Sequence, residues 1–220
     1  MKFANFPILI PAFTARVSLP PVRLSPRIPS SNSQAPALPP FSILPPSPLT
    51  SRGPFPPSPF HQIYIDTPLP ITADLLNIPF LPRAGTIISE PDYRPALRAT
   101  FVHGSDFLRR DPDGQMVRLD VTSVARDSTG ALLRFNYNGV VGMAGDEGKV
   151  IRGEDNATTT GFGNAFVQVR FETDSPGLKL LEDKMYVGSG RFVVEVNKPI
   201  IVEYKISEVG APCQGDQELA

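Results

Sequence analysis

The sequence predicts an all-β domain, either a sandwich or a closed barrel, preceded by a proline-rich segment. From Gly85 onward, at least six segments alternate apolar and polar residues with a period of two, and turn-forming residues separate them. Only one short segment favours a helix. Proline is concentrated earlier, because residues 1–95 hold 22 of the 26 prolines. These patterns indicate a single antiparallel β domain in the C-terminal part of the chain.

The predicted strands follow one another with short connections. The turn 127–130 joins two of them into a hairpin. Residues 174–184 are predicted as the one short helix, with Asp174 or Ser175 as its cap and Pro176 in its first position. A glycine-rich stretch at 142–163 is expected to be a connection. The predicted strands are 96–103, 114–127, 131–142, 165–173, 185–196 and 199–207.

The proline-rich segment at 22–60 is expected to be extended or disordered. Each proline removes a backbone donor and fixes φ, so neither a helix nor a central strand persists there. The segment is therefore expected to lie outside the packed domain.

Alternation also sorts the strand residues into two faces. The polar face mixes charges of both signs, as a solvated exterior does, whereas a polar interior would bury many charges at high cost. The sequence therefore favours an apolar interior over a polar one. The apolar face carries Val117, Leu119, Val121, Leu133, Phe135, Tyr137, Val167, Val169, Phe171, Val202, Tyr204 and Ile206. The polar face carries Arg118, Asp120, Arg134, Asn136, Asn138, Gln168, Arg170, Glu172, Glu203 and Lys205.

One of the two histidines, His103, is the first candidate for a functional residue. Alternation along 96–103 places it on the same inner face as Phe101, and Gly104 is expected to bend the chain after it. Asp106 would then orient His103 as a catalytic acid or base. An apolar interior with a few polar tips suits a small ligand, but it equally suits a packed core. The residues predicted to bind a ligand are Phe101, Phe135, Tyr137, Tyr186 and Tyr204.

Composition and motifs argue against several other classes. The formal net charge of −1 disfavours nucleic-acid binding, and no apolar run approaches the length of a membrane helix. One cysteine and two histidines offer neither a disulfide nor a metal site, and no phosphate-binding loop or nucleophile elbow is present. We therefore expect no cofactor and no metal, and a cytoplasmic location.

Several stretches of the chain resemble an uncharacterised family of β-barrel proteins, domain of unknown function 3237. They are "AGTIISEPDY", "LRATFVHGSDFLRRDPDGQMVRLDVTSVARDSTGALLRFNYNGVVG", "FGNAFVQVRFET", "LKLLEDKMYVGSGRF" and "KPIIVEYKISEV", and the similarity is closest to the fungal branch. The family's Gly-Gly-Thr entry to its second strand is replaced here by Ala84-Gly85-Thr86.

The resemblance implies a calycin-like antiparallel barrel over 61–209 that forms a homodimer. It also implies a first strand within 1–21, an insertion at 22–60 and a flexible tail at 210–220. The family carries no established catalytic residue that could be transferred to this chain.

Three functions remain open on this basis. The barrel binds a small apolar, secondary-metabolite-like molecule, or it is a cofactor-free cyclase or isomerase of the pericyclase type in fungal natural-product biosynthesis. In the enzyme, His103 would transfer a proton and Tyr137 or Tyr204 would donate to a developing oxyanion. In the third alternative, the barrel is a structural or oligomerising protein with a filled core.

Overall fold

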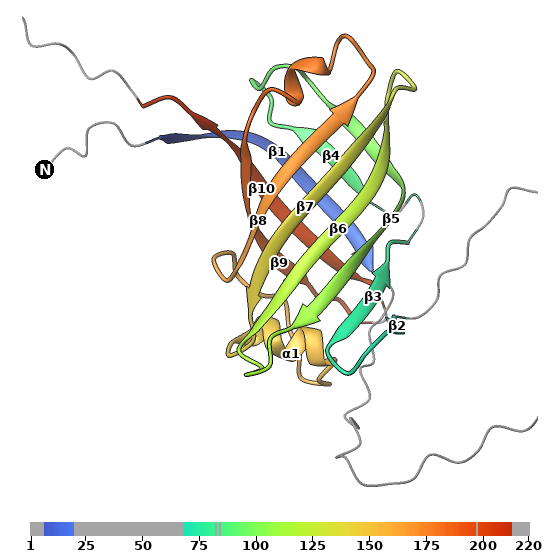
Figure 1. The fold of residues 1–220 in the computed structure, drawn as a ribbon, viewed down its shortest axis with the longest axis vertical. Coiled ribbons are helices and arrows are strands. Elements are labelled where there is room, and N and C mark those ends of the chain that lie inside the picture. Colours follow the sequence, from blue (N-terminus) through green and yellow to red (C-terminus); the bar gives the residue numbers. More distant parts are fainter. Residues whose placement is uncertain (1–6, 20–67, 82, 84, 197, 213–220) are drawn as a thin grey trace, which may run out of the picture.

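The structure is a computed structural model that describes residues 7–19, 68–81, 83, 85–196 and 198–212 (Figure 1). The predicted proline-rich segment 22–60 lies outside the described residues, as does the predicted tail beyond residue 212.

Ten strands form one antiparallel sheet, and eight of them close into a barrel (Figure 1). The order is β2-β3-β5-β4-β1-β10-β9-β8-β7-β6, and β6 pairs back onto β5. The prediction of an all-β fold is confirmed, and the barrel is the alternative that forms. The strands are β1 (Ile8–Leu19), β2 (Leu69–Pro70), β3 (Leu75–Pro79), β4 (Thr86–Ser89), β5 (Arg98–Arg110), β6 (Met116–Asp127), β7 (Leu132–Gly142), β8 (Ala165–Thr173), β9 (Tyr186–Val193) and β10 (Ile200–Gly210).

In one part of the barrel wall, the described strands on either side form no β-ladder with each other, and we call this part the seam. One edge of β5 pairs with β6, and two strands share its other edge. β4 pairs with residues 98–100 of β5, and β3 pairs with residues 105–109. β4 also pairs with β1, through residues 13–16. Among the described residues, β3 pairs with neither β1 nor β10. The seam therefore runs between β3 on one side and the end of β1 and the start of β10 on the other. The seam ends where the backbone N–H of Leu81 donates a hydrogen bond to the Ser18 carbonyl, at 3.1 Å.

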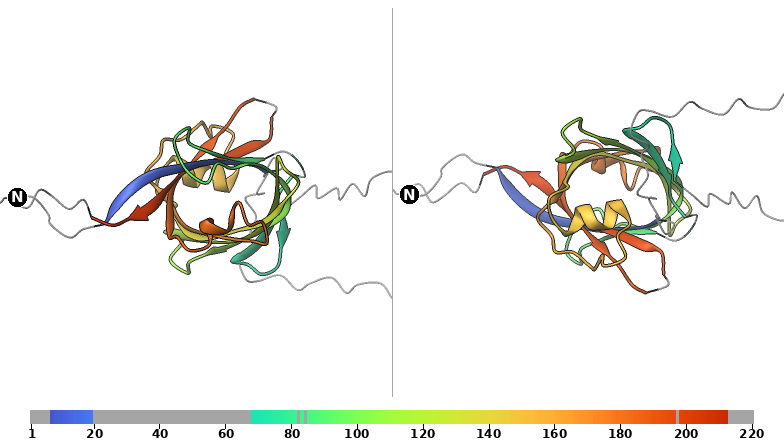
Figure 2. Two further views of the ribbon diagram at one scale, coloured as in Figure 1. Left: turned by 90° about the horizontal axis from the view of Figure 1, so that it is seen from above. Right: turned by 90° about the horizontal axis from the view of Figure 1, so that it is seen from below.

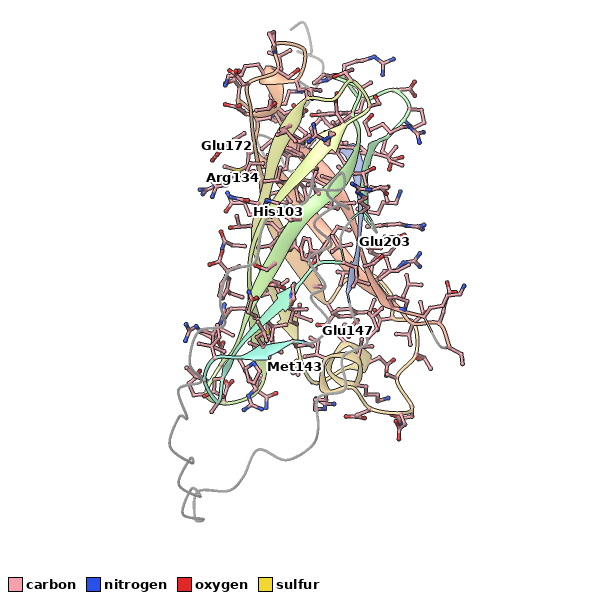
Figure 3. All side chains as sticks on the ribbon, turned by 90° about the vertical axis from the view of Figure 1, so that its right-hand side faces the viewer. His103, Arg134, Met143, Glu147, Glu172 and Glu203 are labelled. Carbon is pink, nitrogen blue, oxygen red and sulfur yellow. The ribbon has the colours of Figure 1, made fainter. Side chains whose placement is uncertain are left out.

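The predicted division into an apolar interior and a polar exterior is confirmed. All twelve residues assigned to the apolar face are buried. The opposite face carries exposed ion pairs, such as Arg134 with Glu172 at 2.9 Å, which project from the outer surface (Figure 3). Glu203 is buried on this outer face because Arg16 and Arg191, its partners on the neighbouring strands, both form ion pairs with it.

The prediction that His103 points inward is wrong. β5 continues through the expected bend and carries a β-bulge between Phe101 and His103, which pair with Ala125 and Val124. The extra residue reverses the alternation, since a shift by one residue moves every later side chain to the other face. His103 is therefore exposed, whereas Asp106 is buried inside the barrel.

Gly104, directly after the bulge, lies against inward-facing groups. A Cβ atom there would lie 2.5 Å from Ser123 Cβ and 2.7 Å from the ring of Phe80. We expect Gly104→Ala to lower the free energy of unfolding by about 1–3 kcal/mol, because neither neighbour has room to move. Urea denaturation measures this change.

The matched control is Gly161→Ala. Gly161 is exposed, and a Cβ atom added there would meet no other part of the chain within 4 Å. This variant should change stability by less than about 1 kcal/mol. Equal effects of the two substitutions would show that the chain does not pack closely at Gly104.

The helix prediction is wrong in its position. Residues 174–184 contain only the 3-10 turn η1 (Lys179–Leu181), while the α-helix α1 (Asp146–Arg152) lies within the expected glycine-rich connection. Figure 2 shows α1 over one end of the barrel and η1 over the other. α1 begins with Asp146 and Glu147 in its first turn and ends at Gly153, whose φ of 68° is left-handed. No helix in the described part of the chain is long and apolar enough to cross a membrane.

Candidate functional site

The barrel contains a cavity at its α1 end. The space between the lining atoms is about 640 Å³ when its open mouth is counted. The volume in which the centre of a water molecule fits is much smaller, about 40 Å³. The enclosed part thus has room for a few waters, and a larger ligand would have to extend into the open mouth. Among the described residues, three lining side chains carry polar atoms: Asp106, Tyr137 and Tyr204. The others are Val17, Leu76, Ile78, Phe80, Leu108, Leu119, Val141, Val150, Ile151, Phe192, Ile200 and Val202.

Asp106 is a buried carboxyl in this apolar lining, with only 8% of its surface exposed. Its Oδ1 accepts a hydrogen bond from the Asp120 backbone N–H at 3.0 Å. Oδ2 has no hydrogen-bond partner among the described residues. Every fully buried side-chain oxygen of these residues does have a partner, so Oδ2 is not fully buried and faces open space. Burial raises the pKa of the Asp106 carboxyl to about 7, with the Asp120 N–H opposing the shift and the Asp120 charge adding to it.

Tyr137 and Tyr204 reach the same cavity from β7 and β10, and their ring centroids are 5.2 Å apart. Burial raises the pKa of both phenols above the usual value, and the negative charge of Asp106 raises both further. The two hydroxyls also hydrogen-bond to each other, which raises the pKa of Tyr137 and lowers that of Tyr204. Both hydroxyls therefore stay protonated at neutral pH and can donate hydrogen bonds. Gly190 makes room for Tyr204, since a Cβ atom there would lie 2.5 Å from its ring.

The edge of the cavity is apolar and half-buried. Leu76 and Ile200 lie on the two sides of the seam, Leu108 follows Asp106 on the inner face of β5, and Ile151 comes from α1. α1 itself lies over this end of the barrel, as the positions of Met143 and Glu147 indicate (Figure 3). Asn164 fixes the start of α1 by donating to Glu147 Oε2 at 2.8 Å. The seam and α1 thus border the mouth of the site.

The other end of the barrel is packed and fully hydrogen-bonded. Tyr93 donates to Glu208 at 2.5 Å, and the Tyr93 and Tyr186 hydroxyls are 3.0 Å apart. Lys184 binds both Glu208, at 2.8 Å, and the Tyr93 hydroxyl, at 3.1 Å. Burial raises the pKa of Tyr186 to about 12. In this half of the barrel, the polar tips of these side chains bond to one another.

The structure divides the predicted site residues into three groups. Asp106, Tyr137 and Tyr204 line the cavity together. Phe101, Phe135 and Tyr186 are buried in the packed interior and do not line it, as the contacts of Phe135 with Phe101 and Phe171 show, with centroids 5.6 and 5.4 Å apart. His103 lies on the outer face, so Asp106 does not orient it.

Several cavity residues lie outside the set that the sequence predicted. Leu76, Ile78 and Phe80 come from β3 and the residue after it, and Val150 comes from α1. The alternation of apolar residues at 76, 78 and 80 was a usable signal for an inward-facing strand. In the described part of the chain, no group of three or more His, Cys, Asp or Glu side chains is placed to hold a metal ion.

Fold and cavity together define the class of this protein: a small closed antiparallel barrel with an apolar interior cavity. Residues 59–209 match the model of a family described as protein of unknown function (DUF3237), and the chain belongs to this family. A search of the curated proteins finds no match.

Three solved structures share the fold, each with a TM-score of 0.52. A β-barrel-like protein from Acinetobacter baumannii is 18% identical, and the match covers 95% of this chain and 99% of that one. A protein of unknown function from Clostridium acetobutylicum is 12% identical, with coverages of 92% and 97%. A conserved protein of unknown function from Rhodopseudomonas palustris is 14% identical, with coverages of 92% and 98%. At these identities the likeness shows the fold alone.

Proposed function

We propose that the barrel binds a compact, mostly apolar molecule with one oxygen that meets Asp106, Tyr137 and Tyr204. The observation that carries the proposal is the buried Asp106, whose Oδ2 has no partner among the described residues and which lines an otherwise apolar cavity. A polar atom that faces an apolar cavity is stabilised by a hydrogen-bond partner there. A ligand oxygen, or a water that a ligand displaces, supplies the missing partner.

The composition of the cavity supports this class of ligand. Small-molecule sites combine a mainly apolar lining with a few polar groups that fix the ligand's orientation. Here the three polar groups are two phenols that donate and a carboxyl that donates or accepts according to pH. A ring compound with a carbonyl or hydroxyl oxygen suits them, and this narrows the expected secondary-metabolite-like ligand to a compact one.

A filled, purely structural core is less well supported. The packed end of the barrel shows how this chain satisfies buried tyrosines, with a hydrogen-bond partner for each hydroxyl of Tyr93 and Tyr186. At the α1 end, the hydroxyls of Tyr137 and Tyr204 also bond to each other, but there Asp106 and both tyrosines border open space. That contrast favours a binding site over a packing arrangement.

The test compares 2-indanone with indane, which has the same ring frame and no oxygen. We expect 2-indanone to bind at least about 5-fold more tightly, because one hydrogen bond contributes about 1 kcal/mol. Dissociation constants are measured by saturation-transfer NMR, with Gln168→Ala on the outer face as the control variant that binds normally.

A second variant locates the binding. Ile151→Trp places a larger side chain at the cavity edge and should weaken binding without lowering the melting temperature. Equal affinities for the two ligands, or undiminished binding by a folded Ile151→Trp protein, would overturn the proposed function.

A further inference from the structure

We propose that this cavity catalyses proton transfer at the carbon next to a bound carbonyl group, with Asp106 as the acid–base residue and Tyr137 and Tyr204 as donors to the carbonyl oxygen. The substrate class is compact ketones with an acidic C–H bond, and the reaction class is enolisation and the isomerisations that follow from it. The inference rests on the proposed function, since the ketone must first bind in the cavity.

The first argument is the placement of the carboxyl. The hydrogen bond from Asp120 N–H to Oδ1 fixes the group at one oxygen, while Oδ2 faces the cavity without a partner among the described residues. A general base needs a free oxygen within reach of the substrate proton and a fixed orientation. Asp106 meets both requirements, whereas His103 lies on the other side of the sheet.

The second argument is the placement of the two phenols. Asp106 pairs with Val121, and Val121 pairs with Tyr137, so Asp106 and Tyr137 lie in one row across three neighbouring strands. Tyr204 contacts Tyr137 and completes the group. Donors held in a dry site stabilise an enolate oxygen without reorganising. The rings are held by packing, Tyr137 against Phe135 at 5.7 Å and Tyr204 in the space left by Gly190.

The third argument is protonation. An acid–base group works best when its pKa lies near the working pH, and burial raises the pKa of Asp106 to about 7. Tyr137 and Tyr204 face Asp106 and keep their protons in this range, and Asp120 adds its charge from β6. The carboxyl therefore changes charge near neutrality while the two phenols keep their protons.

The step balances within the site. The carboxylate of Asp106 takes a proton from the α-carbon, so that the C–H bond breaks and an O–H bond forms on Asp106. The electron pair moves onto the carbonyl oxygen, which the tyrosine hydroxyls stabilise as the enolate. Asp106 then returns a proton to the same carbon, or to another carbon of an unsaturated ketone, which gives the isomer. Neither oxidant nor reductant is consumed.

The experiment follows exchange of the α-protons of 2-indanone for deuterium in D₂O by NMR. The full-length protein should exchange them faster than buffer alone, and the rate should rise with pH and level off above about 7 as Asp106 ionises. Asp106→Asn should lower the protein-dependent rate by about 100-fold or more. Tyr137→Phe and Tyr204→Phe should each lower it by about 10-fold or more.

Two measurements keep the outcomes separate. His103→Ala, on the outer face, is the control and should leave the exchange rate unchanged. Affinity for 2-indanone and melting temperature are measured on every variant, so that lost folding is not taken for lost catalysis. Binding without exchange, or unchanged exchange by Asp106→Asn, overturns this inference and leaves the proposed function standing. Failure of the native protein to bind 2-indanone overturns both.

Discussion

An Asp106→Asn variant will be more stable than the native protein at pH 8, by up to about 4 kcal/mol, and this advantage will disappear as the pH falls toward 4. The pKa of the buried Asp106 carboxyl is about 7, against an ordinary value of 3.8. At about 1.4 kcal/mol per pKa unit, the fully ionised carboxylate carries this cost, and asparagine removes it while keeping an oxygen for the Asp120 N–H.

The direction of the pH dependence of stability follows from the raised pKa of Asp106. Between about pH 4 and pH 7 the folded protein binds a proton at Asp106 that the unfolded chain has lost, so stability falls as the pH rises through this window. Urea denaturation of both proteins from pH 4 to pH 9 measures the difference. The exposed substitution Asp174→Asn serves as the control and should change stability only slightly. A constant difference for Asp106→Asn would contradict the burial of a titrating carboxyl.

Phe135→Ala will lower the free energy of unfolding by about 3–5 kcal/mol, whereas Arg134→Ala, one residue earlier, will cost less than about 1 kcal/mol. Phe135 is fully buried, and its ring contacts those of Phe101, Tyr137 and Phe171. Arg134 points outward and pairs with Glu172, both side chains being about half exposed.

Chemical denaturation of the two variants tests which face of β7 supports the barrel. Comparable losses would mean that the two faces of β7 contribute equally to stability. A larger loss for Arg134→Ala would mean that the polar face is the structural one.

The sequence predicted the interior of the barrel well where strands were regular. From β6 to β8 the period of two is unbroken, so that Tyr137 and its apolar neighbours were assigned to the correct face. The tyrosines of the cavity were therefore within reach of sequence reasoning. Which of them lines open space was not, because that depends on how side chains from distant strands fill the interior.

Two local features defeated the prediction elsewhere. The bulge at Phe101–His103 inserts one residue opposite β6, and nothing in the local alternation of residues marks it. The sequence therefore predicted that His103 points inward and that Asp106 orients it. α1 was missed because it is only seven residues long and contains a glycine, Gly148. Gly148 packs against Met143, since a Cβ atom on Gly148 would lie 2.1 Å from the Met143 carbonyl oxygen. Tertiary packing overrides helix propensity at that position.

The seam gives the barrel a property that a fully hydrogen-bonded wall lacks. Eight strands hold their shape through backbone ladders, but β3 and the end of β1 share no ladder among the described residues, and apolar side chains such as Leu76, Val17 and Ile200 line the cavity there. Moving these strands apart breaks no ladder hydrogen bond in the described part of the chain. The wall at the seam can therefore open locally at a smaller free-energy cost than global unfolding.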